Sequence, residues 1–111
     1  MDKIQHYRQL IQQILKDHAK ISSNKGNVEA QLIFDTEHDH YQLAYVGWDS
    51  DQRIFGPVMH FDIKNGKIWI QYNGTEERVG ETLMKLGVPP SDIVIGFHSA
   101  FKRQFTAYAI G

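Results

Sequence analysis

The stretch FDTEHDHYQL, residues 34–43, holds the densest group of side chains that could do chemistry. Two histidines, two aspartates and one glutamate fall between Asp35 and His40. Carboxylates and imidazoles bind cations and transfer protons, so such side chains build metal sites and hydrolytic centres. The same residue types are also typical of a polar turn, because Asp side chains hydrogen-bond the backbone of turns. The stretch is therefore either part of a reaction centre or a polar loop.

The spacing of the histidines and acids matches no specific metal motif. His38 and His40 would share one side of an extended segment, but a zinc or iron site needs further ligands from elsewhere. His60 and Asp62 form a similar pair, and nothing in the sequence places it beside the first. We therefore predict no metal site and no cofactor.

Other catalytic arrangements have weak support. Nuclease chemistry needs several acids and a lysine around a divalent cation, and acids in a loop are also common for conformational reasons. His98 and Ser99 are adjacent, but no nucleophile elbow surrounds them. The chain has no cysteine, which excludes disulfides, thiolate metal sites and cysteine nucleophiles. No glycine-rich phosphate loop is present. We predict no catalytic residue; the acids available to a nuclease would be Asp35, Glu37, Asp39 and Asp62.

The charge of the chain argues against a duplex-binding face. With 12 basic and 13 acidic residues among 111, the formal net charge is -1, whereas gripping DNA through many phosphates requires a broad basic surface. Lys102 and Arg103, beside His98, form only a small basic corner. With Phe101 and Phe105 they could touch a nucleic-acid backbone and stack on bases; a solvated turn is the alternative.

Composition predicts one folded domain over residues 1–111. Hydrophobic residues make up 41% and charged residues 23% of the chain, which is typical of a globular protein. The N-terminus has no unbroken apolar region, and no stretch approaches the roughly 18 apolar residues of a membrane span. We expect a cytoplasmic protein with no membrane contact.

Residues 3–21 predict an amphipathic helix. Their apolar positions recur at steps of three and four, and a polar segment at residues 22–27 ends the pattern. We expect this helix to pack on a sheet, although the spacing also permits a homodimer or partner seam. The stripe comprises Ile4, Tyr7, Ile11, Ile14, His18 and Ile21, widened by Leu10 and Leu15.

Two hairpins follow. Alternating residues on either side of the polar stretch predict that Phe34 pairs with Tyr41, and that residues 35–40 form the loop. Asn65-Gly66 predicts a two-residue type I′ turn, because both positions of that turn need positive φ. The first register also pairs Leu32 with Leu43 and Ala30 with Tyr45. The second register pairs Lys64 with Lys67, Ile63 with Ile68, Asp62 with Trp69, Phe61 with Ile70, His60 with Gln71 and Met59 with Tyr72.

The second hairpin has a mainly polar face that includes one tryptophan. Trp69 shares it with His60 and Asp62. Either the N-terminal helix or the C-terminal segment covers Trp69, or Trp69 anchors a contact surface, since indole is enriched at interface hot spots. Trp48, at the end of an earlier strand, raises the same question. The other residues of this face are Lys64, Lys67 and Gln71.

The remaining segment predicts a second helix, a short strand and a tail. Thr75 is the expected cap, Glu76 and Glu77 the first turn, and Gly87 with Pro89 the stop. Val79, Leu83, Met84 and Leu86 form its apolar stripe. Residues 93–95 predict a short strand, and Phe97, Phe101, Phe105 and Tyr108 a helical or extended tail docked on the core. The predicted fold is α+β: a single domain with the N-terminal helix packed on a mainly antiparallel sheet of two hairpins plus a short extra strand, and a second helix after the sheet.

The run GKIWIQYNGTEERVGETLMKLGVPPSDIVIGFH, residues 66–98, resembles the signature of the XisI family, the fdxN-element excision controlling factors of cyanobacteria. The resemblance continues upstream through DTEHDHYQLAYVGWDSDQRIFGPVMHFDIKNGKIWIQ and downstream through KRQFTAYAIG, and it covers nearly the whole chain. Joint occurrence of GKIWIQ, GVPPSDIV and GFH makes it far more specific than the other motifs. The polar family positions fall on His40, Arg53, His60, Asp62 and His98.

This resemblance implies an accessory role in programmed DNA excision during heterocyst differentiation. Family members act with a site-specific recombinase and a companion protein, XisH, and are expected to control excision rather than cut DNA. The leading hypothesis is binding of an XisH-like protein or the recombinase through the sheet, with Lys102 and Arg103 approaching DNA. Direct nucleic-acid binding and an enzyme of unrecognised type remain alternatives. The candidate partner-binding residues are Trp48, Arg53, His60 and Trp69.

Overall fold

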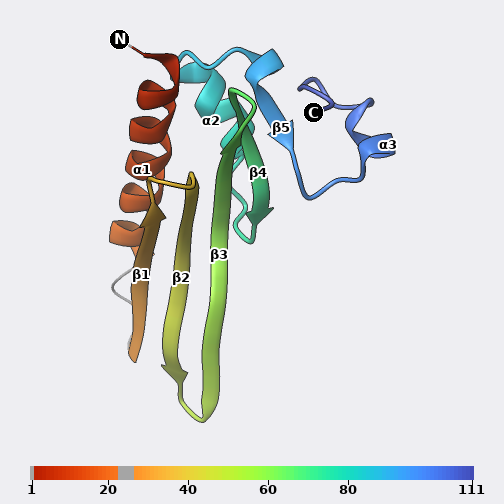
Figure 1. The fold of residues 1–111 in the computed structure, drawn as a ribbon. Helices are drawn as coiled ribbons and strands as arrows, with labels where there is room; N and C mark the ends of the chain where they lie inside the picture. Colours follow the sequence, from red (N-terminus) through yellow and green to blue (C-terminus); the bar gives the residue numbers. More distant parts are fainter. Residues whose placement is uncertain (1, 23–26) are drawn as a thin grey trace.

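The computed structural model describes residues 2–22 and 27–111 and has the predicted α+β fold (Figure 1). One sheet with strand order β1-β2-β3-β4-β5 is antiparallel except between β4 and β5, which run parallel. The elements are α1 (Lys3–Ser22), β1 (Asn27–Asp35), β2 (His40–Asp49), β3 (Gln52–Lys64), β4 (Lys67–Asn73), α2 (Val79–Lys85), the 3₁₀ turn η1 (Pro90–Asp92), β5 (Ile93–Ile95) and α3 (Ala100–Arg103).

The N-terminal helix packs on the sheet as predicted. Tyr7, Ile11 and Leu15 of α1 are buried together with Leu43 and Phe61 of the sheet, and each such burial contributes about 1.5–3 kcal/mol. The apolar stripe of α1 is therefore used within the chain. The side chains of Ile21 and Ser22 and the whole of residues 23–26, which belong to the predicted helix end, lie outside the described part.

The first hairpin has the predicted register, with a shorter turn. Phe34 pairs with Tyr41, Leu32 with Leu43 and Ala30 with Tyr45. Asp35 and His40 also pair across the strands, so the predicted loop of residues 35–40 was too long at both ends. The turn spans residues 36–39.

The second hairpin follows the prediction only near its turn. Asn65 and Gly66 have φ of 54° and 77°, as a type I′ turn requires, and the register holds as far as Phe61 with Ile70. Beyond a bulge, His60 pairs with Tyr72 and Met59 with Asn73, so the last two predicted pairs were wrong. The bulge inserts Gln71 and interrupts the strict alternation of faces. Tyr72, predicted on the shared apolar face, is 46% exposed.

The sequence did not predict the hairpin that joins these two units. β2 and β3 are connected through Ser50 and Asp51, and the whole of β2 pairs with β3 from Gln52 to Asp62, with a bulge near Leu43. Ser50 has a φ of 54°, a left-handed conformation that is uncommon outside glycine. The lower ends of β1–β3 extend beyond α1 and beyond the shorter β4 (Figure 1). This projecting end is the most prominent departure from a compact shape.

The second helix is shorter than predicted. α2 begins at Val79 and is not capped by Thr75, whose hydroxyl instead accepts a hydrogen bond from the Glu77 amide within the preceding turn. Glu76 and Glu77 therefore precede the helix. Val79 and Leu83 are buried as expected, and Gly87 with φ of 98° ends the helix. Met84 and Leu86, also predicted in the buried stripe, are exposed because a helix of this length covers little of the sheet.

The short strand was predicted correctly, whereas most of the aromatic tail is not docked. β5 lies parallel to β4, and a bridge from Ala109 to Val94 brings the C-terminus back against β5. Tyr108 packs against the core. The only helix in the tail is the four-residue α3. The bridge to β5, rather than one stripe of buried aromatic side chains, attaches the tail to the rest of the fold. The remaining aromatics, Phe97, Phe101 and Phe105, are 51%, 69% and 73% exposed.

Candidate functional site

A cluster of polar side chains lies on the face of the sheet opposite α1. Strand alternation places Tyr41 and Phe61 in the core, so the neighbouring His40, His60 and Asp62 point to the other face. His40 is the cross-strand partner of Asp62, which joins the polar ends of the two predicted hairpins. We call His40, His60 and Asp62 the His-Asp cluster.

One carboxylate connects the members of this cluster. His40 Nδ1 donates to Asp62 Oδ1 over 2.7 Å, and His60 Nε2 lies 2.8 Å from the same oxygen. Gln71 donates to Asp62 Oδ2 over 3.0 Å. His60 Nδ1 lies 2.9 Å from Gln42 Oε1. The two amide side chains therefore hold the carboxylate and one imidazole from the outside.

The cluster combines a buried acid with an exposed base. Asp62 is 8% exposed; burial raises the pKa of its carboxyl, but hydrogen bonds from His40, Gln71 and His60 outweigh burial and hold that pKa below its usual value. The hydrogen bond to Asp62 raises the pKa of His40 above its usual value. The side chain of His40 is 54% exposed. The arrangement can orient an imidazole toward solvent, store a proton or hold a cation.

The rest of the opening polar stretch has structural roles. The side chain of Asp35 accepts hydrogen bonds from the backbone amides of Glu37 and His38 and from the His38 ring. Asp39 accepts two hydrogen bonds from Arg8 of α1 and one from the Tyr41 hydroxyl. These contacts make the stretch a polar turn anchored to α1. Among the described residues, only His40 of this stretch joins a group with metal-ligand spacing.

The projecting end of the sheet carries a second candidate site. The Arg53 guanidinium lies 5.3 Å from the Trp48 ring and 5.8 Å from the Phe55 ring, both within cation–π range. Trp48 is 50% and Phe55 75% exposed. The sequence had indicated Trp48 and Arg53 but not Phe55, although the spacing from Arg53 to Phe55 in an extended segment was a usable signal. We call these three residues the aromatic tip.

Trp69 is not part of the aromatic tip. Lys64 Nζ lies 4.4 Å and the Arg103 guanidinium 5.1 Å from its ring, and Gly111 approaches its edge. The C-terminal segment thus covers Trp69, which was one of the two alternatives from the sequence. Its indole Nε1 is buried and has no hydrogen-bond partner among the described residues.

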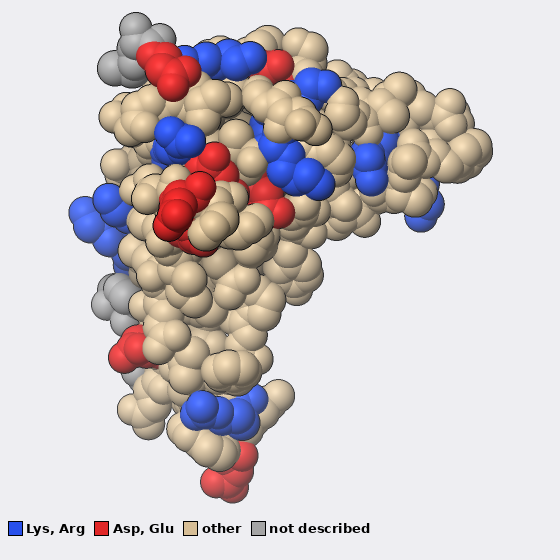
Figure 2. All heavy atoms as spheres, viewed as in Figure 1, with Lys and Arg blue, Asp and Glu red and all other residues tan. Residues whose placement is uncertain are grey.

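The basic corner is partly used within the fold. Arg103 donates to the carbonyl oxygens of His98 and Ile110 over 3.0 and 2.9 Å, while Lys102 is exposed. The His98 ring packs edge-on against Phe97. Figure 2 shows Lys and Arg interspersed with Asp and Glu on the upper part of the visible face, with no continuous basic band there. On this face, only a small basic surface is available to nucleic acid.

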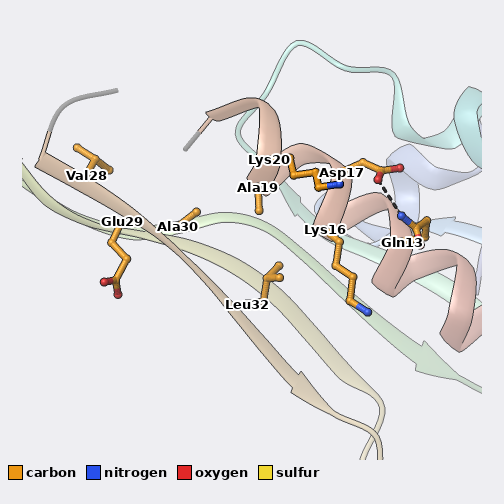
Figure 3. Close-up of a pocket in the computed structure, with 9 residues that line it drawn as sticks. All are labelled: Gln13, Lys16, Asp17, Ala19, Lys20, Val28, Glu29, Ala30 and Leu32. Atoms are coloured by element: carbon orange, nitrogen blue, oxygen red, sulfur yellow. Dashed lines mark hydrogen bonds between the residues drawn. The ribbon is translucent and has the colours of Figure 1, made fainter. Parts of the chain in front are cut away.

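An open hollow of about 650 Å³ lies between the end of α1 and β1 (Figure 3). Gln13 and Asp17 are hydrogen-bonded on its helix side, and Ala30 and Leu32 lie on its strand side. None of the candidate residues from the sequence lines it. Within the described ranges, no helix combines the length and apolar character needed to span a bilayer.

Comparisons with known proteins agree with the resemblance seen in the sequence. The profile of the family described as "XisI protein" matches residues 1–110. A crystal structure of a XisI-like protein from Anabaena variabilis ATCC 29413 is 43% identical, with a TM-score of 0.91, and the match covers 99% of this chain and 100% of that one. A second, titled fdxN element excision controlling factor XisI from the same organism, is 36% identical with a TM-score of 0.87 and the same coverage. No curated protein matches.

Proposed function

The chain belongs to the XisI family, and from this premise we propose that it controls site-specific DNA excision by binding a protein partner rather than by catalysis. A structural relative over the whole chain is titled an fdxN element excision controlling factor, which supports a regulatory role in excision. The partner proposed is an XisH-like protein or the recombinase. The aromatic tip is the proposed contact surface.

Exposure of the aromatic tip is the observation that carries the proposal. Trp48 and Phe55 expose half or more of their surface on a ribbon that projects beyond the helices (Figure 1). Aromatic and arginine side chains dominate binding energy at protein interfaces. The contacts of Arg53 with both rings hold the three side chains together, which lowers the conformational entropy lost on binding. The tip is therefore suited to insertion into an apolar pocket rimmed by acidic groups.

The other candidate residues are less suited to contact a partner. Trp69 is covered by the C-terminal segment, and His60 takes part in the His-Asp cluster. Direct gripping of duplex DNA has little support, because the net charge is -1 and Arg103 is engaged with carbonyl groups. Lys102 could touch DNA once a partner has bound it.

A quantitative pull-down tests the proposal. The purified chain is titrated against the XisH-like protein and the recombinase of its own host, and Trp48→Ala with Phe55→Ala is expected to weaken one of the two interactions by at least tenfold. Phe101→Ala is the matched control, because Phe101 is an aromatic of similar exposure, 69%, on a different surface. Circular dichroism verifies folding of each variant.

Two results would contradict this function. Unchanged affinity of the double variant for a partner that binds the native chain would exclude the aromatic tip. Binding of duplex DNA by the chain alone, with a log-log salt slope steeper than about -3, would favour the nucleic-acid alternative, because each phosphate contact adds about -0.9 to the slope.

A further inference from the structure

We propose that the His-Asp cluster binds a divalent transition-metal ion through His40, His60 and Asp62. This site is independent of the aromatic tip. The donor atoms are one nitrogen from each imidazole and one carboxylate oxygen, and they lie within 4.8 Å of one another. Two histidines and one carboxylate are a donor set that proteins use for zinc and iron.

The environment of His60 favours a cation at the centre of the cluster. Both ring nitrogens face oxygen atoms, Nδ1 toward Gln42 Oε1 at 2.9 Å and Nε2 toward Asp62 Oδ1 at 2.8 Å. In the tautomer that carries its proton on Nδ1, His60 donates to Gln42 Oε1, and its Nε2 lone pair is then available to an ion beside Asp62 Oδ1. A histidine whose outer nitrogen is held by an amide or carbonyl oxygen is the usual arrangement in metal sites.

The support around the carboxylate points the same way. Asp62 is 8% exposed, and hydrogen bonds to both of its oxygens compensate the burial and fix the position of the carboxylate. Gln71 holds Asp62 Oδ2 at 3.0 Å, which leaves Oδ1 directed at the two imidazoles. The backbones of His40 and Asp62 are paired strand neighbours, so two of the three ligands come from a rigid frame.

Metal binding requires only local adjustment. With bonds of about 2.0–2.1 Å, neighbouring ligand atoms in a metal site lie about 3.0–3.4 Å apart, whereas both imidazoles now lie 2.7–2.8 Å from Asp62 Oδ1. The His40 nitrogen that now donates to Asp62 must offer a lone pair instead, so its proton is released to solvent or moves to the other ring nitrogen when the ion binds. The ligand nitrogens then move away from the oxygen and converge on the ion. His40 has the freedom to do so, since its side chain is 54% exposed. The same exposure leaves coordination positions open to water.

The donor set also selects the class of ion. Imidazole nitrogens suit Zn²⁺, Fe²⁺, Co²⁺ and Ni²⁺, whereas Mg²⁺ and Ca²⁺ prefer oxygen ligands.

The sequence did not predict this site because His40 is separated from His60 by 20 positions, and only the pairing of β2 with β3 brings them together.

Isothermal titration of chelator-treated, tag-free protein with Zn²⁺ tests the proposal. We expect one ion per chain, at least a hundredfold weaker binding in His60→Ala, and a similar loss in His40→Ala. His40→Ala is informative even where His60→Ala fails to fold, because His40 is exposed. His38→Ala is the matched control, since it removes an exposed histidine outside the cluster. Co²⁺ should give a visible absorption band in the native protein and the control only, and a tenfold excess of Mg²⁺ should not displace Zn²⁺.

Other outcomes would overturn the site. No Zn²⁺ binding by the native chain would show that the cluster is a hydrogen-bonded network and not a metal site. Binding that His40→Ala leaves unchanged, or that His38→Ala abolishes, would place the ion elsewhere on the chain.

Discussion

Replacing Asp39 should reveal how the polar turn fastens the N-terminal helix to the sheet. Asp39 accepts hydrogen bonds from Arg8 Nε and Nη2 over 2.8 and 3.2 Å and from the Tyr41 hydroxyl over 2.8 Å. It also has a φ of 61°, a conformation that Asp and Asn adopt more easily than other non-glycine residues. Asp39→Ala removes the ion pair with Arg8, the acceptor for the Tyr41 hydroxyl and the side chain that tolerates a positive φ. Asp39→Asn removes the ion pair but keeps an acceptor for Tyr41 and the tolerance of a positive φ.

The exposure of the side chains around Asp39 indicates how much stability each of the two variants should lose. Arg8 and Asp39 expose 27% and 17% of their side chains, so solvent screening limits the contribution of the bidentate pair to about 1 kcal/mol. Tyr41 is fully buried, and loss of its acceptor costs about 1–2 kcal/mol. The left-handed backbone adds about 1 kcal/mol for alanine. We expect Asp39→Ala to lower the free energy of unfolding by about 3–4 kcal/mol and Asp39→Asn by about 1 kcal/mol.

Urea unfolding followed by far-ultraviolet circular dichroism measures these changes. A double-mutant cycle with Arg8→Ala isolates the pair and should give a coupling energy near 1 kcal/mol. Glu37→Ala is the control, because its exposed side chain precedes Asp39 in the same turn. Equal losses in Asp39→Ala and Asp39→Asn would refute the role assigned to Tyr41 and the backbone. A coupling energy of zero would refute the anchoring of α1.

Two further predictions concern close contacts between elements of the fold. Tyr7→Phe removes a 2.5 Å hydrogen bond to Asp92 and should cost about 1.5–2 kcal/mol at neutral pH, since the acceptor is charged. Burial raises the pKa of Asp92, but hydrogen bonds from Tyr7 and Lys3 outweigh it and lower the pKa overall. The stabilisation by Asp92 is thus complete above its unfolded pKa and is lost as the pH falls through its folded pKa. The difference in unfolding free energy between the native chain and Tyr7→Phe should therefore narrow below about pH 4. A difference that widens in acid would contradict this. Gly47→Ala would place a Cβ 2.0 Å from the backbone oxygen of Asn27. It should therefore separate the start of β1 from β2 and speed amide hydrogen exchange in that part of the sheet. Unchanged exchange would contradict the close approach of the two backbones at Gly47.

Local patterns explain much of the fold. The steps of three and four in α1 and the alternation in β1, β2 and β4 each determine which side chains can face a core, because helices and strands have fixed periods. Asn65-Gly66 selects one turn type and therefore one register near it. These features depend on neighbouring residues only, and the structure agrees with the sequence there.

The sites depended on contacts between distant segments. No local signal encoded the bulge at Gln71 or the pairing of β2 with β3, because both depend on how whole strands pack. That pairing places His40 beside Asp62 and leaves Trp48 and Phe55 exposed at a projecting end. By itself the sequence determined the family, the element types and the polar character of residues 35–40. Tertiary structure alone decided that His40 leaves the turn to join His60 and Asp62, since side-chain clusters on a sheet form across strands and not along them.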